Sequence, residues 1–158
     1  MDISFGDKHV VVTGGSRGIG RAIALAFAAA GADVSICARG ADALAAAGRE
    51  LEAHGGKVHA ATCDLGDGEA VLRYVAAAGE ALGGIDVLVN NASGFGASDD
   101  EAGWAASIQV DLMASVRASR AALPFIERAG GGSIVHIGSI AGLRSSARTP
   151  PYGDRKST

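Results

Sequence analysis

Aromatic residues, cysteine and proline are all scarce in this chain. Of its 158 residues, 4% are aromatic, two are cysteine and three are proline, whereas 48% are hydrophobic and 24 are glycine. With so few aromatic rings, the composition suits helices packed closely on a sheet more than an aromatic-lined barrel. The length is sufficient for a single domain, residues 1–158, with a substantial core.

The sequence also lacks the patterns of several functional classes. Its net charge of −3 comes from scattered charges, and without a basic stripe no nucleic-acid partner is expected. Cys37 and Cys63 each lie in or just after an apolar run, where a small buried side chain is expected rather than a disulfide or a ligand. The four histidines show no metal-ligand spacing, so no metal is expected.

Long apolar runs and targeting patterns are absent from the sequence as well. No apolar run reaches membrane-spanning length, so a membrane is not an expected partner. The first residues resemble neither a signal peptide nor a transit peptide. We therefore expect a cytoplasmic protein.

Strand and helix patterns alternate along the chain, which predicts an α/β fold with a parallel sheet covered on both faces. Strands are expected at residues 8–13, 33–37, 57–62, 86–90 and 133–137. Helices are expected at residues 17–30, 41–54, 67–82 and, as one long helix, 101–128. Right-handed crossovers then predict a doubly wound, Rossmann-like sheet with the strand order 3-2-1-4-5.

A glycine-rich turn joins the first expected strand to the first expected helix. Glycines let the backbone turn sharply and let a ligand come close to the main chain. The following helix points unpaired N–H groups and the positive end of its dipole at the occupant of the turn, for which a pyrophosphate is expected. A tight turn without a ligand is the alternative. The candidate cofactor contacts here are Thr13, Gly14, Ser16, Arg17, Gly18, Ile19 and Gly20.

The end of the second expected strand indicates which nucleotide is bound. An acidic residue at this position would hydrogen-bond the ribose 2′-hydroxyl of NAD and repel a 2′-phosphate. This sequence has Ala38 and Arg39 instead, and Arg17 could supply a second cation. Because guanidinium groups suit phosphate, NADP(H) is expected in preference to NAD(H). The alternative is that Arg39 is a solvated loop arginine.

The glycine turn resembles the T-G-x-x-x-G-I-G signature of the short-chain dehydrogenases/reductases. The stretch from Asn90 to Ser93, Asn-Asn-Ala-Ser, resembles the N-N-A-G turn of that family, with Ser93 in place of its glycine. The resemblance implies that the first asparagine steadies the central strands and that main-chain atoms of the turn flank the adenosine ribose. It also implies that Asp64 takes the adenine amino group, although Asp64 could equally cap the third helix. The candidate contacts from these stretches are Asp64, Leu65, Asn91 and Ala92.

Near the end of the chain stands the family's Ser…Tyr-x-x-x-Lys constellation, as Ser139, Tyr152 and Lys156. A carbonyl that receives hydride becomes an alkoxide and needs a proton, which a phenol can give. A neighbouring ammonium favours the phenolate. The resemblance implies an NADP-dependent oxidoreductase in which Tyr152 is the general acid/base, Ser139 hydrogen-bonds the substrate oxygen and Lys156 also holds the nicotinamide ribose. A small carbonyl or alcohol is therefore the expected substrate.

The sequence departs from the family pattern in the long helix. Asp111 stands where the family has a catalytic asparagine, and it could hold a water or pair with Lys156; an exposed helix acid is the alternative. The resemblance covers only about the first two-thirds of the family's domain, so we expect the C-terminal strands to be missing. An inactive nucleotide-binding or structural fragment is the second hypothesis. The family also implies a homo-oligomer, a dimer or tetramer, built partly from the long helix.

Overall fold

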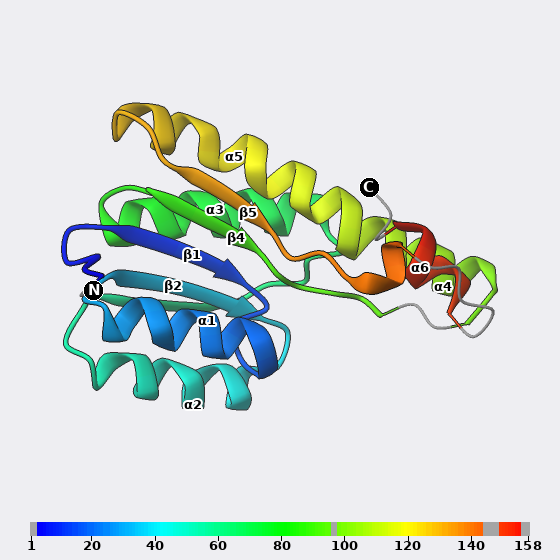
Figure 1. The fold of residues 1–158 in the computed structure, drawn as a ribbon, viewed down its shortest axis with the longest axis horizontal. Coiled ribbons are helices and arrows are strands. Elements are labelled where there is room, and N and C mark those ends of the chain that lie inside the picture. Colours follow the sequence, from blue (N-terminus) through cyan, green and yellow to red (C-terminus); the bar gives the residue numbers. More distant parts are fainter. Residues whose placement is uncertain (1–2, 96–97, 144–148, 156–158) are drawn as a thin grey trace.

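The chain forms a five-stranded parallel sheet between two layers of helices (Figure 1). The computed structural model describes residues 3–95, 98–143 and 149–155. The strand order is β3-β2-β1-β4-β5, so the doubly wound topology predicted from the sequence is confirmed. The strands are β1 (His9–Thr13), β2 (Asp33–Ala38), β3 (Val58–Thr62), β4 (Val87–Asn90) and β5 (Ser133–His136).

The centre of the sheet is buried on both faces. Val10, Val11 and Val12 of β1 have no exposed surface, as expected for a parallel strand that is covered by helices on both sides. β1 pairs with β2 and with β4, so the order of strands reverses beside it. In sheets of this kind, ligands bind in the crevice at the carboxyl ends of the strands near this reversal.

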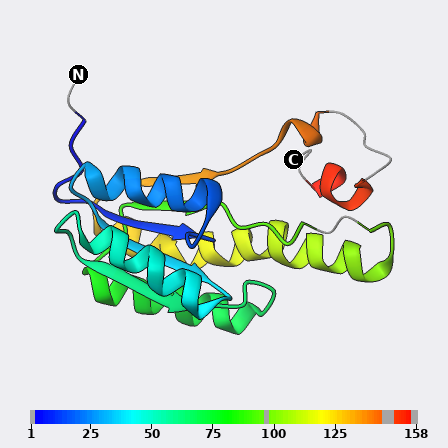
Figure 2. The same cartoon turned by 90° about the horizontal axis from the view of Figure 1, so that it is seen from below.

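Each face of the sheet has its own helix pair. α1 (Gly18–Ala29) and α2 (Ala41–Glu52) cover one face, and α3 (Gly68–Leu82) and α5 (Ala114–Arg128) cover the other (Figures 1 and 2). Small residues let the helices approach closely: a Cβ added at Gly79 of α3 would lie only 2.3 Å from the Phe125 ring of α5. Cys37 and Cys63 are free and buried, as the sequence predicts.

The expected helix over residues 101–128 is continuous but not uniform. It begins as α4 (Glu101–Ala106), widens into a π-helical segment, η1 (Ser107–Met113), and continues as α5 through Pro124 to Arg128. The predicted long helix is therefore confirmed in its bounds, and the structure adds that its middle segment, η1, is π-helical. After β5 follow the short 3₁₀ turn η2 (Ile140–Gly142) and the helix α6 (Pro150–Arg155). The other predicted elements agree with the observed ones within one or two residues.

Candidate active site

The glycine turn between β1 and α1 has a backbone that only glycine fits. Gly14 and Gly18 have φ angles of 70° and 56°, in the left-handed region that glycine adopts readily. A Cβ added at Gly20 would lie 2.3 Å from the carbonyl oxygen of Gly14, and one at Gly15 would lie 2.4 Å from Cγ2 of Ile36. The turn is therefore folded tightly on itself and against β2.

The N-terminus of α1 opens onto this turn with its backbone donors available. Arg17 is the capping residue and has an extended backbone, with φ −157°. Among the described residues, no side chain caps this helix, and its first turn holds no acidic residue. The first N–H groups of a helix need acceptors, and the helix dipole favours an anion there. This cradle fits a phosphate group.

Thr13 and Asn91 join the ends of β1 and β4 beside the turn. The Thr13 hydroxyl accepts hydrogen bonds from the backbone N–H groups of Asn91 at 3.0 Å and Ala92 at 3.3 Å. The Asn91 side-chain amide also donates, to the carbonyl oxygens of Thr13 and Gly14. Asn90, which the family resemblance assigns to the central strands, donates to the Ser119 hydroxyl at 3.2 Å. The two asparagines therefore brace β4 on opposite sides.

Two arginines lie beside the glycine turn and at the end of β2. Arg17 lies in the turn and Arg39 directly after β2, and both are exposed. Within the described part of the chain, neither forms an ion pair with a carboxylate; the arginine that does so is Arg21, with Glu50. Both guanidinium groups are therefore accessible to a ligand phosphate.

Asp64 follows β3 and does not cap the next helix. Its carboxylate accepts the backbone N–H of Gly66 at 3.0 Å, whereas the cap of α3 is Asp67, which accepts from Glu69 and Ala70. The alternative that Asp64 is the helix cap is therefore wrong. Asp64 is exposed and the adjacent Leu65 is buried.

Ser139 and Tyr152 come from the two short elements that follow β5. Ser139 caps η2, and its hydroxyl oxygen accepts the N–H of Ala141 at 3.1 Å. Tyr152 lies in α6, which packs against both η2 and η1, and its ring is half-buried against the Phe95 ring. Both views show α6 beside the α4 end of the long helix (Figures 1 and 2). Lys156, the third member of the predicted constellation, lies outside the described residues.

Asp111 lies in η1 and faces the loop after β4. It is half-buried, and its Oδ2 accepts the backbone N–H of Gly94 at 3.1 Å. The alternative that Asp111 is an exposed helix acid is therefore wrong. π-Helical turns add one residue to the helical repeat and often occur at functional sites.

Comparison with known proteins decides the family. The family model for short chain dehydrogenases matches residues 8–157. The chain belongs to this family. An uncharacterized oxidoreductase of Mycobacterium tuberculosis, MT0954, is 36% identical over 157 residues, which are 95% of this chain and 59% of that protein. The chain thus spans about three-fifths of the length of the curated relatives that it matches.

Solved structures of other short-chain dehydrogenases have the same fold. L-Sorbose reductase from Gluconobacter frateurii, in complex with NADPH and L-sorbose, has a TM-score of 0.94 and 34% identity over 99% of this chain and 62% of its own. A short chain dehydrogenase from Burkholderia cenocepacia, in complex with NADP, has a TM-score of 0.89 and 36% identity over 99% of this chain and 65% of its own. Among the described residues, no helix has the length and apolar character needed to cross a bilayer.

Sequence reasoning about the short-chain dehydrogenase motifs missed one part of this edge. Residues 93–95 form a turn after β4 that is hydrogen-bonded to η1 and contacts α6. Ser93 accepts the Phe95 N–H, Asp111 of η1 accepts the Gly94 N–H, and the Phe95 ring contacts Tyr152 of α6. In the sequence, Ser93 is only a departure from the family turn, and neither Gly94 nor Phe95 belongs to a motif. No local pattern marks Gly94 and Phe95, because their partners Asp111 and Tyr152 lie in η1 and α6.

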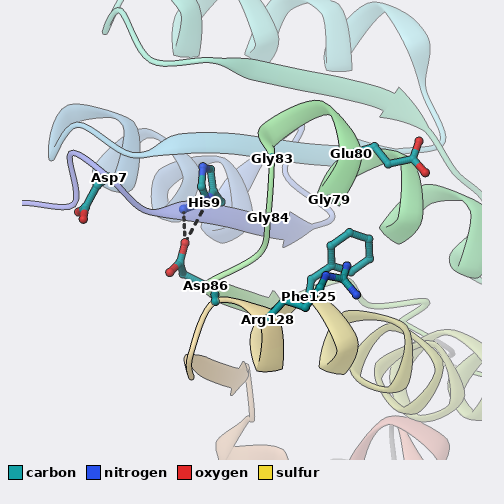
Figure 3. A pocket seen from close by; sticks show the side chains of 10 residues that line it. Asp7, His9, Gly79, Glu80, Gly83, Gly84, Asp86, Phe125 and Arg128 are labelled. Atoms are coloured by element: carbon teal, nitrogen blue, oxygen red, sulfur yellow. Dashed lines mark hydrogen bonds and ion pairs between the residues drawn. The ribbon is translucent and has the colours of Figure 1, made fainter.

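A cavity of about 410 Å³ lies at the opposite end of the strands, where they begin (Figure 3). His9 and Asp86 meet there, with Asp86 Oδ2 3.1 Å from His9 Nδ1 and 2.9 Å from the His9 backbone nitrogen. Burial alone would raise the pKa of Asp86, but the His9 N–H and the Lys8 ammonium hold that pKa below its ordinary value. This cluster ties β1 to β4 and lies far from the glycine turn, so it is separate from the candidate active site.

Proposed function

We propose that this chain provides the nucleotide site and the catalytic residues of an NADP-dependent oxidoreductase, which interconverts a carbonyl and a secondary alcohol by hydride transfer. One observation carries the proposal. The uncapped N-terminus of α1, reached through a turn that only glycine fits, lies at the same carboxyl edge of the sheet as Ser139 and Tyr152. This arrangement supports a phosphate site and a proton donor that act on one bound nucleotide and its substrate.

The residues around the turn would hold the nucleotide. Backbone N–H groups from Ser16 to Gly20 suit the pyrophosphate, and Asp64, Leu65, Asn91 and Ala92 lie at the adjacent strand ends, where the adenosine would bind. The accessible guanidinium groups of Arg17 and Arg39 support a 2′-phosphate, and hence NADP(H) over NAD(H). The two solved relatives that carry NADPH or NADP agree with this preference.

The chemistry of the proposed reaction falls to Tyr152, Ser139 and Lys156. A bound nicotinamide supplies or accepts the hydride. The Tyr152 phenol gives a proton to the substrate oxygen during reduction and takes it back during oxidation. The Ser139 oxygen already accepts from Ala141, so its own proton is directed elsewhere and can be donated to the substrate oxygen. Lys156 would hold the nicotinamide ribose and favour the phenolate.

An assembly of several copies belongs to the same proposal. Ile108, Leu112 and Leu123 on the long helix are 41%, 40% and 44% exposed, which leaves an apolar surface on that helix. Such surfaces frequently mark protein–protein contacts. We therefore propose a homo-oligomer that uses this helix. We further propose that the enzyme is cytoplasmic and acts on a small carbonyl or alcohol. Sedimentation of the protein and of a Leu112→Glu variant would test this contact.

Nucleotide binding is the first experiment, measured as NADPH and NADH fluorescence on titration with protein. We expect NADPH to bind more tightly. Arg39→Ala should weaken NADPH binding by roughly tenfold, the value of one charge-assisted contact, and leave NADH binding unchanged. Arg120→Ala, an exposed arginine of α5, is the matched control. Equal loss for both nucleotides in Arg39→Ala would contradict the assignment of Arg39 to the 2′-phosphate.

Turnover separates the enzyme from a nucleotide-binding protein without activity. In Tyr152→Phe, the rate of NADPH oxidation with a carbonyl substrate should fall by roughly a hundredfold or more, while NADPH affinity stays unchanged. An unchanged rate in this variant would remove Tyr152 from the mechanism. Tight NADPH binding by the wild-type protein without turnover on a broad carbonyl panel would instead support the second hypothesis, an inactive nucleotide-binding or structural protein.

A further inference from the structure

Phe95 has an unusual backbone and an unusual neighbour. Its φ of 43° lies in the left-handed region, and among the described residues no other non-glycine residue has a positive φ. Its ring contacts the Tyr152 ring, with centroids 5.0 Å apart and planes at 59°, although 60% of the residue is exposed. A phenylalanine rarely adopts such a backbone unless its surroundings impose it.

Ser93 is the first of two residues whose side chains hold this backbone conformation. Its hydroxyl oxygen accepts the backbone N–H of Phe95 at 3.1 Å, which closes a local turn of the kind that serine side chains form. The short-chain dehydrogenase pattern has glycine at this position, and a glycine has no side-chain acceptor to offer. The hydrogen bond that closes the turn at Phe95 therefore depends on Ser93 and is not available to the family's glycine.

Asp111 is the second residue, and it acts on the neighbouring Gly94. Its Oδ2 accepts the Gly94 N–H at 3.1 Å. A Cβ added at Gly94 would lie 2.8 Å from the carbonyl oxygen of Ala106, so the backbone of this residue rests directly on the long helix. Segment 93–95 is thus held from two sides. The two residues whose side chains accept these hydrogen bonds, Ser93 and Asp111, are both positions where the sequence departs from the family pattern.

We propose that Phe95 is a positioning residue for Tyr152, held in place by Ser93 and Asp111. The proposal rests on the proposed function, in which Tyr152 transfers the proton. Tyr152 lies in α6, whose packing against η1 and η2 brings its ring to Phe95. The Phe95 ring limits the directions in which the phenol can point, and a catalytic group must be held within narrow limits of its productive geometry.

Nitration by tetranitromethane tests the contact without any need for activity. The sequence has two tyrosines, and Tyr74 is 4% exposed, so it is an internal reference in peptide mass spectrometry. Phe95→Ala should raise the nitration rate of Tyr152 several-fold, and Ser93→Ala should raise it less. Leu72→Ala, an exposed apolar residue of α3, should leave the rate unchanged. An equal Tyr152 rate in Phe95→Ala and wild type would overturn the proposal.

Kinetics test the consequence of the contact. Phe95→Ala should lower kcat by roughly ten- to a hundredfold with NADPH affinity unchanged, and Phe95→Tyr, which keeps a ring, should recover most of the rate. Phe95→Gly removes both the ring and the left-handed strain, so it should fold and should lose rate as Phe95→Ala does. A kcat within twofold of wild type in both ring-deleted variants would overturn the positioning role.

The two readouts also separate this proposal from the proposed function. If the wild-type protein binds no NADPH or turns over no carbonyl, the proposed function fails, and nitration still decides whether Phe95 restrains Tyr152. If the wild-type protein is active and Phe95→Ala keeps its full rate, the proposed function stands and the role of Phe95 fails.

Discussion

Thr13 accepts two hydrogen bonds from Asn91 at the centre of the sheet. The Asn91 backbone N–H donates to the Thr13 hydroxyl at 3.0 Å, and the Asn91 side-chain amide donates to the Thr13 carbonyl oxygen at 3.0 Å. These bonds join β1 to the chain after β4 at the point where the order of strands reverses. The glycine turn and the loop that leads to Phe95 are thereby fixed to each other.

We predict that Thr13→Val destabilises both the fold and the nucleotide site. Valine keeps the shape of threonine but removes the acceptor of two N–H groups, those of Asn91 and Ala92. The loss in the free energy of unfolding should be about 2 kcal/mol, measured by urea denaturation. Thr13→Ser keeps the hydroxyl and is the control. Equal stability of Thr13→Val and Thr13→Ser would show that the hydroxyl does not hold these strands together.

A methyl group at Gly20 should disrupt the turn. In Gly20→Ala the new Cβ would meet the Gly14 carbonyl oxygen and the Asn91 amide nitrogen, both at 2.3 Å. We expect a loss of about 2–3 kcal/mol in unfolding free energy together with weaker NADPH binding. Gly40→Ala is the control, because a Cβ there meets no atom of the described residues within 4 Å; Gly40 caps α2, so its loss should stay within about 1 kcal/mol and leave NADPH binding unchanged. Unaltered NADPH affinity in Gly20→Ala would argue against the glycine turn as the nucleotide site.

The Asp86 carboxylate should contribute stability that depends on pH. Its pKa is lower in the folded protein than the ordinary value of 3.8, since the His9 N–H and the Lys8 ammonium outweigh the effect of burial. This contribution is fully present above pH 3.8 and is lost as the pH falls through the lower pKa of the folded state.

Asp86→Asn should therefore cost about 1–2 kcal/mol at pH 7, and the difference from wild type should shrink as the pH falls below the ordinary pKa of Asp86. Denaturation at a series of pH values measures this. Asp7→Asn removes a nearby carboxylate whose side chain is 88% exposed, and it should have little effect at any pH. A difference between Asp86→Asn and wild type that stays constant down to acid pH would refute the prediction.

The fold was largely readable from the sequence. The apolar run from Val10 to Val12 and the regular alternation of strand and helix patterns predicted the parallel sheet and its order, because a strand covered on both faces must be apolar throughout. The glycine turn was readable for a related reason: its backbone geometry depends on the residue types within the turn itself.

The π-helical segment and the Phe95 contact were decided by tertiary structure. The sequence around Asp111 reads as ordinary α-helix, and the wider turn occurs where Asp111 reaches Gly94, 17 residues earlier in the chain. The roles of Ser139, Tyr152 and Lys156 remain predictions of the motif. By itself, the sequence determined the sheet and the turn, because backbone preferences and burial patterns are local. Only the folded chain brought Phe95 to Tyr152 and Gly94 to Asp111, because these contacts join segments far apart in the sequence.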